Sequence, residues 1–145
     1  MVFISATRLR LRSAWFLLPF LRSNSRTLKQ LKRESAFIKG KLLVDRRLTF
    51  WTLTAWRNEQ DMHAYRNSGA HLEAMPKLIN WCDEAHAAHW SQDGEELPAW
   101  HQVYQRIIAP EARVSKVRYP SKDHNTKNVP APRYPSRLEQ TLLPR

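Results

Sequence analysis

The hydrophobic pattern of the chain switches between a two-residue and a helical period. Apolar and polar residues alternate over 2–12, which is typical of a half-buried strand. An apolar run followed by basic residues with leucines at helical spacing predicts a long helix over 14–35. Two runs rich in β-branched and aromatic residues, 37–44 and 48–56, are separated by a short polar turn, so we expect a β-hairpin.

A second helical region follows the hairpin. Asn58 with Asp61 three residues later predicts a helix N-terminus, because an Asn side chain caps the first free N–H groups. Ser68 and Gly69 interrupt this helix, and a second helical pattern with one apolar face extends over 70–85. We therefore expect two consecutive helices here.

The remaining elements are a short strand over 86–92, a helix over 97–109 and a tail. The order strand, helix, strand, strand, helix, strand is that of the ferredoxin-like βαββαβ fold of the α+β class. Its helices lie on one face of the sheet, so a second subunit or an extra element must cover the other. Residues 111–145 are basic, rich in proline and poor in apolar residues, which predicts an extended or disordered tail behind a domain of residues 1–110.

The charge of the chain raises the question of nucleic-acid binding. Its 145 residues contain 24 Lys and Arg against 13 Asp and Glu, a net charge of +11. However, glycine is scarce, the zinc-finger spacing is missing from the sequence, and so are the aromatic motifs of RNA-binding sheets. Because the basic residues are spread over a strand, a helix and the tail, we interpret them as a solvated surface and do not expect a nucleic-acid partner.

The apolar run at 14–21 imitates a secretory signal. It is short, contains Pro19, ends at Arg22 and lacks a small-residue cleavage site, so we reject that interpretation. It is also too short to span a bilayer, although docking to a membrane surface stays open. Cys82 is the single cysteine, which excludes an internal disulfide and fits a cytoplasmic protein.

Histidine and tryptophan residues are the candidates for chemistry. His71, near the start of the second helix, could act as a base, a hydrogen-bond donor or an iron ligand, or could simply be a surface or capping residue. On a strand His86 and His89 point to opposite faces, so we expect no metal site. The six tryptophans either fill a core or line a wide cavity.

Several segments resemble a known superfamily. They are Ser5-Ala6-Thr7-Arg8-Leu9, the strand over 50–56, Met62 with Tyr65, Ser68-Gly69-Ala70-His71, and Ala74-Met75. Together they resemble the antibiotic-biosynthesis-monooxygenase-like superfamily over residues 2–92, and within it the uncharacterised and spheroidene-monooxygenase-like branches.

The resemblance implies a dimeric α+β barrel, in which two sheets pack face to face, with a cavity between sheet and helices. Members oxidise polyketide-type aromatics without a cofactor, bind or degrade haem, or have no known activity. The haem-degrading branch uses an Asn on the first strand and a Trp and a His on the helix, where this chain has Thr7, Tyr65 and Met75. His71, one turn before Met75, could take over as axial ligand.

These patterns lead to one functional expectation and one alternative. We expect a cytoplasmic homodimer that binds a small apolar molecule, aromatic or isoprenoid, and acts as a monooxygenase, with either no cofactor or haem. The alternative is a non-catalytic ligand-binding or scaffold protein of the same fold. The expected catalytic residue is His71, and the expected cavity-lining residues are Thr7, Trp51, Trp56, Tyr65, Met75 and Trp81.

Overall fold

The computed structural model describes residues 1–133 and 139–145. In chain order the elements are β1 (Val2–Leu11), the 3-10 helix η1 (Ala14–Phe16), α1 (Leu17–Lys32), β2 (Phe37–Asp45), β3 (Thr49–Trp56), α2 (Glu59–Arg66), α3 (Gly69–Trp81), β4 (Cys82–Gln92), α4 (Trp100–Ile107), β5 (Arg113–Val114), α5 (Lys122–Asn125) and β6 (Glu139–Leu142). Asn58 caps α2 as expected, because its Oδ1 accepts a hydrogen bond from the Asp61 N–H at 2.8 Å.

The strands form one antiparallel sheet in the order β5-β4-β1-β3-β2-β6. β1 lies at its centre between β3 and β4, and β2 pairs with β3 as the expected hairpin. The four-strand order β4-β1-β3-β2 with helices connecting β1 to β2 and β3 to β4 is the ferredoxin-like arrangement. The α+β class and the βαββαβ core predicted from the sequence are therefore confirmed.

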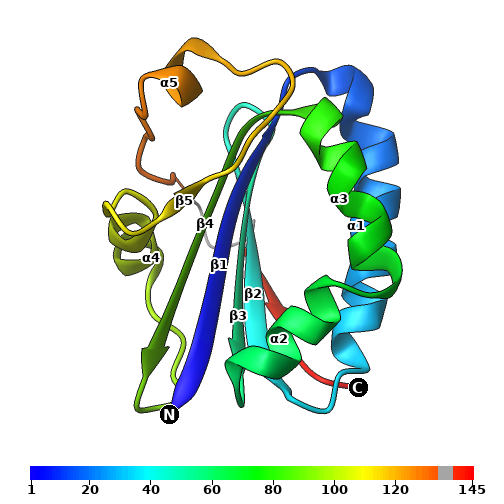
Figure 1. Ribbon diagram of the computed structural model, residues 1–145, viewed down its shortest axis with the longest axis vertical. Coiled ribbons are helices and arrows are strands. Elements are labelled where there is room, and N and C mark those ends of the chain that lie inside the picture. Colours follow the sequence, from blue (N-terminus) through cyan, green and yellow to red (C-terminus); the bar gives the residue numbers. More distant parts are fainter. Residues whose placement is uncertain (134–138) are drawn as a thin grey trace.

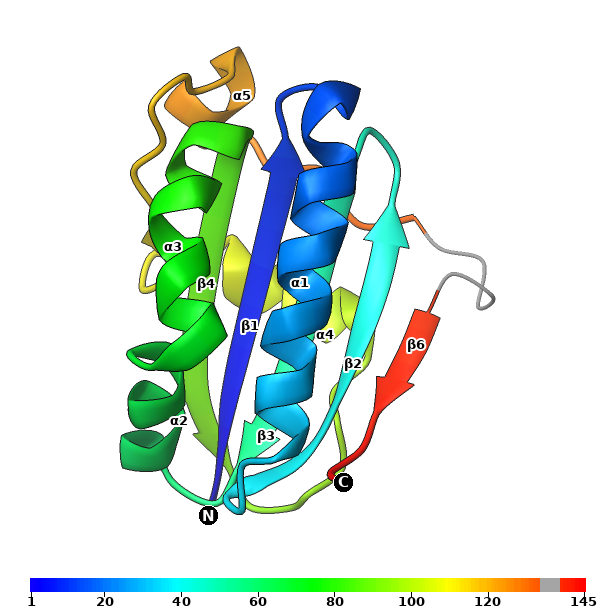
Figure 2. The ribbon, with the colours of Figure 1, turned by 90° about the vertical axis from the view of Figure 1, so that its right-hand side faces the viewer.

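The two faces of the sheet carry different layers. Helices α1, α2 and α3 cover one face, with α1 and α3 side by side, whereas α4 lies against the opposite face (Figures 1 and 2). Successive residues of a strand point to opposite faces, so each strand supplies side chains to both layers. In β1, Thr7 points to the layer of α1–α3 and Arg8 to the layer of α4.

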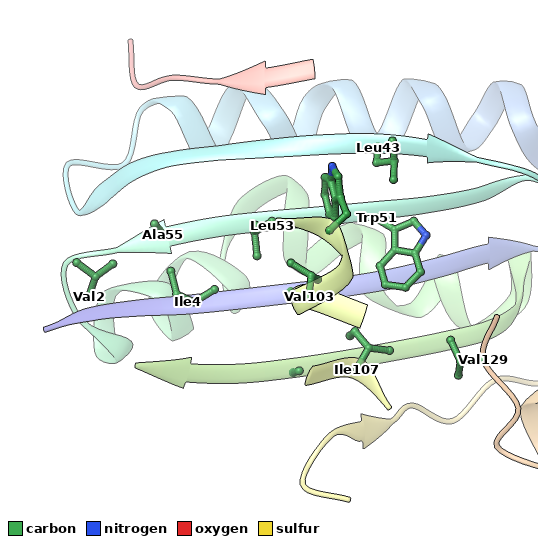
Figure 3. Close-up of a cluster of buried hydrophobic side chains, with 12 residues drawn as sticks. Val2, Ile4, Leu43, Trp51, Leu53, Ala55, Val103, Ile107 and Val129 are labelled. Carbon is green, nitrogen blue, oxygen red and sulfur yellow. The ribbon is translucent and has the colours of Figure 1, made fainter. Parts of the chain in front are cut away.

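The extra helix α4 covers the second face of the sheet with its own apolar side. Trp100, Val103 and Ile107 recur at helical spacing and are all buried. They pack on a cluster that includes Ile4 and Trp51 of the sheet (Figure 3). An element of the same chain thus covers the face that the sequence left for a partner or an additional element.

The C-terminal segment differs from the extended or disordered tail expected for 111–145. Its described parts lie against the domain: β5 pairs with β4 at one edge of the sheet and β6 with β2 at the other. The reason is that its few apolar residues are placed to be buried, and Val117, Val129 and Leu142 are each withdrawn from solvent. The part of the expected tail at 134–138 lies outside the described residues.

The boundary between α3 and β4 also differs from the sequence expectation. The apolar helical pattern predicted a helix to Ala85, but α3 ends at Trp81 and β4 begins at Cys82, whose backbone is extended. Pairing with β1 decides this boundary, since Glu84 lies beside Arg10 in the ladder and the two side chains form an ion pair. Pro76 lies inside α3, so the chain does not form a loop there.

Candidate functional site

A cavity of about 340 Å³ lies between the sheet and the layer of α1–α3. Its floor is made of short side chains on alternate positions of three strands, and these leave room below the helices. They are Ser5, Thr7, Thr52, Thr54, Ala85 and Ala87. Its upper walls come mainly from apolar residues of α1 and α3, among them Phe20, Leu28, Ala74, Met75 and Leu78.

The segment after β5 closes the side of the cavity next to β4. The Ser115 N–H donates to the carbonyl of Ala85 at 2.9 Å, and the Arg118 N–H donates to the carbonyl of Ile79 at 3.0 Å. The residues between these two anchors bridge from β4 to α3, and Val117 among them lines the cavity. The C-terminal segment is therefore part of the wall.

His71 lies in the wall with a defined tautomer. Its Nδ1 is 3.1 Å from the carbonyl oxygen of Arg66. A carbonyl oxygen only accepts, so Nδ1 carries the hydrogen and Nε2 of the neutral ring is free to accept a proton. Burial lowers the pKa of His71, and the nearby charge of Arg66 acts in the same direction, while hydrogen bonding to the Arg66 carbonyl opposes them. The imidazole is therefore neutral at pH 7.

Gln30 of α1 fixes the turn that presents His71. Its Nε2 donates to the carbonyl oxygen of Ser68 at 2.9 Å, and its Oε1 accepts from the His71 N–H at 2.9 Å. Gly69 adopts φ +56°, and a Cβ there would lie 3.2 Å from the Gln30 amide, so this position favours glycine both in conformation and in space. The sequence pattern gave no signal for Gln30, because its contacts join residues far apart in the chain.

Tyr65 and Trp56 close the end of the cavity near His71. Their rings are tilted against each other with centroids 5.2 Å apart, and the Tyr65 ring meets that of His71 edge-on at 5.0 Å. The Trp56 Nε1–H donates to Thr54 Oγ1 at 2.9 Å. Burial raises the pKa of Tyr65, so the phenol stays protonated.

The structure brings together five of the seven residues expected at the site. His71, Thr7, Trp56, Tyr65 and Met75 all line the cavity. Sequence reasoning missed other lining residues, among them Arg66, His89, Arg113 and Lys116.

The other two expected lining residues, Trp51 and Trp81, lie outside the cavity. Trp51 is five positions from Trp56 on the same strand, and an odd separation sends the two side chains to opposite faces. It packs edge-on against Trp100 of α4, with centroids 6.5 Å apart. Trp81 is the last residue of α3 and packs against the cluster of Leu11, Phe20 and Cys82.

A second, smaller pocket of about 170 Å³ lies on the α4 side of the sheet. Arg8, Arg10 and Glu84 contribute to it, and Glu84 accepts hydrogen bonds from both arginines and from Ser121. Burial alone would raise the pKa of Glu84, but these hydrogen bonds and the two guanidinium charges hold it below its usual value. The carboxylate is therefore ionised and internally paired.

The side chains of the described residues show whether the protein could hold a metal ion or haem. Within residues 1–133 and 139–145, His, Cys, Asp and Glu side chains do not gather in any group of three that could hold a metal ion. Of the histidines that line the cavity in the described structure, His71 has the arrangement suited to haem iron, because metal-binding histidines commonly donate their second ring N–H to a backbone carbonyl. It is the residue that would hold haem, which when bound supplies oxygen chemistry.

Comparison with known proteins gives the fold. No family model matches the sequence, and no curated protein is similar to it. Among solved structures, a putative antibiotic biosynthesis monooxygenase from Nitrosomonas europaea matches with a TM-score of 0.56 and 13% identity, over 63% of this chain and 89% of its own. The chain has the fold of the antibiotic-biosynthesis-monooxygenase-like proteins.

Two further structures support this conclusion. SnoaB from Streptomyces nogalater, a cofactor-independent oxygenase, matches with a TM-score of 0.54 and 15% identity, over 66% of this chain and 98% of its own. A conserved protein from Methanosarcina mazei matches with a TM-score of 0.58 and 12% identity, over 64% and 94%. The closer assignment to a spheroidene-monooxygenase-like branch stays a prediction.

The helices can also be compared with the dimensions of a bilayer. In the part of the chain that the structure describes, none combines the length and the apolar composition that a membrane crossing requires.

Proposed function

We propose that the protein binds a small apolar molecule, aromatic or isoprenoid, in the cavity between the sheet and α1–α3 and oxidises it as a monooxygenase. The observation that carries this proposal is a cavity with apolar walls next to a neutral histidine whose Nε2 is free to accept a proton. A cavity of this size is within the range of small-molecule sites.

In the cofactor-free form the substrate supplies the electrons. His71 Nε2 accepts a proton from an acidic C–H or O–H of the substrate, and the resulting anion reduces oxygen. For a methylene group the balance is CH₂ + O₂ → C=O + H₂O, so one oxygen atom enters the product and the other leaves as water. Thr7, Trp56, Tyr65 and Met75 orient the apolar body of the substrate.

Oxygen consumption tests the catalytic proposal. Full-length protein is incubated with naphthoquinols and short isoprenoids, and oxygen uptake and ¹⁸O incorporation are measured with and without haem. His71→Ala should reduce turnover by about 10²-fold or more, the contribution of a general base. Binding without turnover in every condition would favour the alternative, a non-catalytic ligand-binding or scaffold protein.

A haem titration decides between the two cofactor expectations. The absorption spectrum of the protein with added haem should shift if His71 provides the axial ligand, and the shift should be lost in His71→Ala but kept in His101→Ala, a change of an exposed histidine. An unchanged haem spectrum would leave the cofactor-free form.

The homodimer and the cytoplasmic location belong to the same proposal. α4 covers the sheet face through which two subunits of a barrel would stack, so a homodimer must either use another surface or displace α4. Light scattering on the full-length chain measures its mass. The observation that supports a reducing compartment is the single cysteine, Cys82, which excludes an internal disulfide.

A further inference from the structure

The charges around the cavity have one sign. Among its lining residues are the cations Arg66, Arg113 and Lys116, and no Asp or Glu of the described residues contributes to the lining. They come from separate segments, the end of α2, β5 and the residues after β5, so the fold collects them at the cavity. Within residues 1–133 and 139–145, none of these three cations forms an ion pair with a carboxylate.

Arg66 carries an unused donor. Its Nε is buried and has no hydrogen-bond partner among the described residues. Arg66 as a whole is half-buried, but a buried N–H without an acceptor is costly, because that N–H has lost its water without gaining a hydrogen bond. A ligand with an acceptor at this position would remove that cost.

Arg66 and Arg113 lie near the same residue of the cavity, His89. Arg113 is opposite Ala87 in the β4–β5 ladder, two residues before His89. His63, three residues before Arg66 in α2, meets the His89 ring edge-on with centroids 6.1 Å apart.

The charges of the two arginines also act on the neighbouring histidines. Burial lowers the pKa of His89, and the charges of Arg66 and Arg113 lower it further, as Arg66 does for His71. Glu59 acts on His89 in the opposite direction, but its carboxylate is 3.2 Å from His63 Nε2 and belongs to a different, exposed pair. This end of the cavity therefore combines two guanidinium groups with neutral imidazoles.

We propose that the molecule bound in the cavity is an apolar carboxylic acid, whose carboxylate is held by Arg66 with Arg113 and Lys116 at the mouth. A guanidinium group matches the two oxygens of a carboxylate in a planar fork. The apolar walls take the body of the acid, and His71, whose Nδ1 lies 3.1 Å from the backbone carbonyl oxygen of Arg66, is beside the carboxylate end. This inference rests on the proposed function, since it names the substrate class of the same cavity.

Matched ligands test the inference without any readout of activity. 1-Naphthoic acid and 1-naphthamide have the same apolar body, and geranic acid and geraniol form a second pair. Calorimetric titration of the full-length protein should give a Kd at least about tenfold lower for each acid than for its neutral partner, as expected for a charge-assisted hydrogen bond. The preference should weaken as salt is added.

Substitutions test which residues cause the tighter binding of the acids. Arg66→Met keeps most of the stem, and the ratio of the two dissociation constants should fall to about one, whereas Arg66→Lys should keep part of it. Arg113→Met changes an exposed residue and is therefore expected to fold. It should also reduce the ratio of the two dissociation constants, so the inference can be tested even if Arg66→Met does not fold. Arg22→Met, an exposed arginine of α1 outside the cavity lining, should leave the ratio unchanged.

Three results would overturn the inference. Equal affinity for acid and neutral partner in the unaltered protein would refute the carboxylate and leave the proposed function standing. A preference that survives in both Arg66→Met and Arg113→Met would refute the assigned residues. Binding of neither acid nor neutral partner would refute the inference together with the apolar-ligand proposal.

Discussion

Arg8 Nη1 lies 2.7 Å from Glu84 Oε1, and both side chains are almost completely withdrawn from solvent, at 3% and 1% exposed. Arg10 Nη1 is 2.8 Å from the second carboxylate oxygen, so Glu84 joins two arginines of β1 to β4. A buried ion pair adds little over an apolar pair, but removal of one partner leaves an uncompensated charge. The two central strands thus depend on Glu84 being present and ionised.

Glu84→Gln should therefore lower the free energy of unfolding by about 3–5 kcal/mol, the cost of leaving a buried charge unpaired. Urea unfolding followed by circular dichroism measures the change. The control is Glu73→Gln, which breaks the exposed pair of Glu73 and Arg26 and should cost less than about 1 kcal/mol. Similar small losses for both variants would contradict the role assigned to Glu84.

His86 should make stability depend on pH. Burial lowers its pKa from 6.5 to about 4, and the charge of Arg8 and the neighbouring His124 act in the same direction, while Glu84 opposes them. Between about pH 6.5 and 4 the unfolded chain therefore binds one proton more than the folded chain. As the pH is lowered through this window, the free energy of unfolding should decrease by an amount on the order of a few kcal/mol.

Urea unfolding at a series of pH values measures the pH dependence of stability that we assign to His86, with His86→Asn as the comparison. The variant should lose less stability than the unaltered protein between pH 6.5 and 4, because its side chain does not titrate. Parallel pH profiles for the two proteins would show that His86 is not the titrating group.

Pro76 lies inside α3 and should lower the stability of this helix. Proline cannot donate to the carbonyl of Leu72, and it disfavours helical geometry at Met75, which lines the cavity. Pro76→Ala should stabilise the protein by about 1 kcal/mol or more and also change ligand affinity. Thermal unfolding and calorimetric binding measure the two effects, and unchanged binding would remove Pro76 from any role in shaping the cavity.

Trp100 should anchor α4 on the sheet. It is 2% exposed and packs against Trp51, so Trp100→Ala should cost about 3–5 kcal/mol. Trp15→Ala provides the matched control, because Trp15 is 85% exposed and its loss should change stability by less than about 0.5 kcal/mol. Equal effects in urea unfolding would mean that α4 does not pack on the sheet in solution.

The C-terminal segment should be required for ligand binding. A chain that ends at residue 110 loses the wall formed around Val117 and the buried side chains of Val129 and Leu142. It should be several kcal/mol less stable, at about 1.5–3 kcal/mol for each buried residue, and should bind naphthoic acid more weakly. Equal affinity and stability in the shortened chain would show that residues 1–110 form an independent domain.

The fold class could be predicted from the sequence because periodicity is a local property. The alternation over 2–12, the hairpin runs and the Asn58 cap each depend on residues close in the chain, and their order matches one fold. The same alternation fixed that Thr7 and Arg8 face opposite layers.

The boundary after Trp81 could not be predicted in this way, since strand pairing with β1 overrides an apolar pattern that reads equally well as helix.

The residues of the site also fall into two groups, those that the sequence indicated and those that only the tertiary structure brought together. The resemblance to the superfamily indicated Thr7, Tyr65 and Met75, the position near a helix start indicated His71, and the excess of tryptophan indicated Trp56, and all five line the cavity. Only the tertiary structure decided that Arg66, Arg113 and Lys116 meet at one cavity, that Gln30 fixes the turn before His71, and that α4 covers the second face of the sheet. These relationships join segments far apart in the chain, and no local pattern encodes the distance between them.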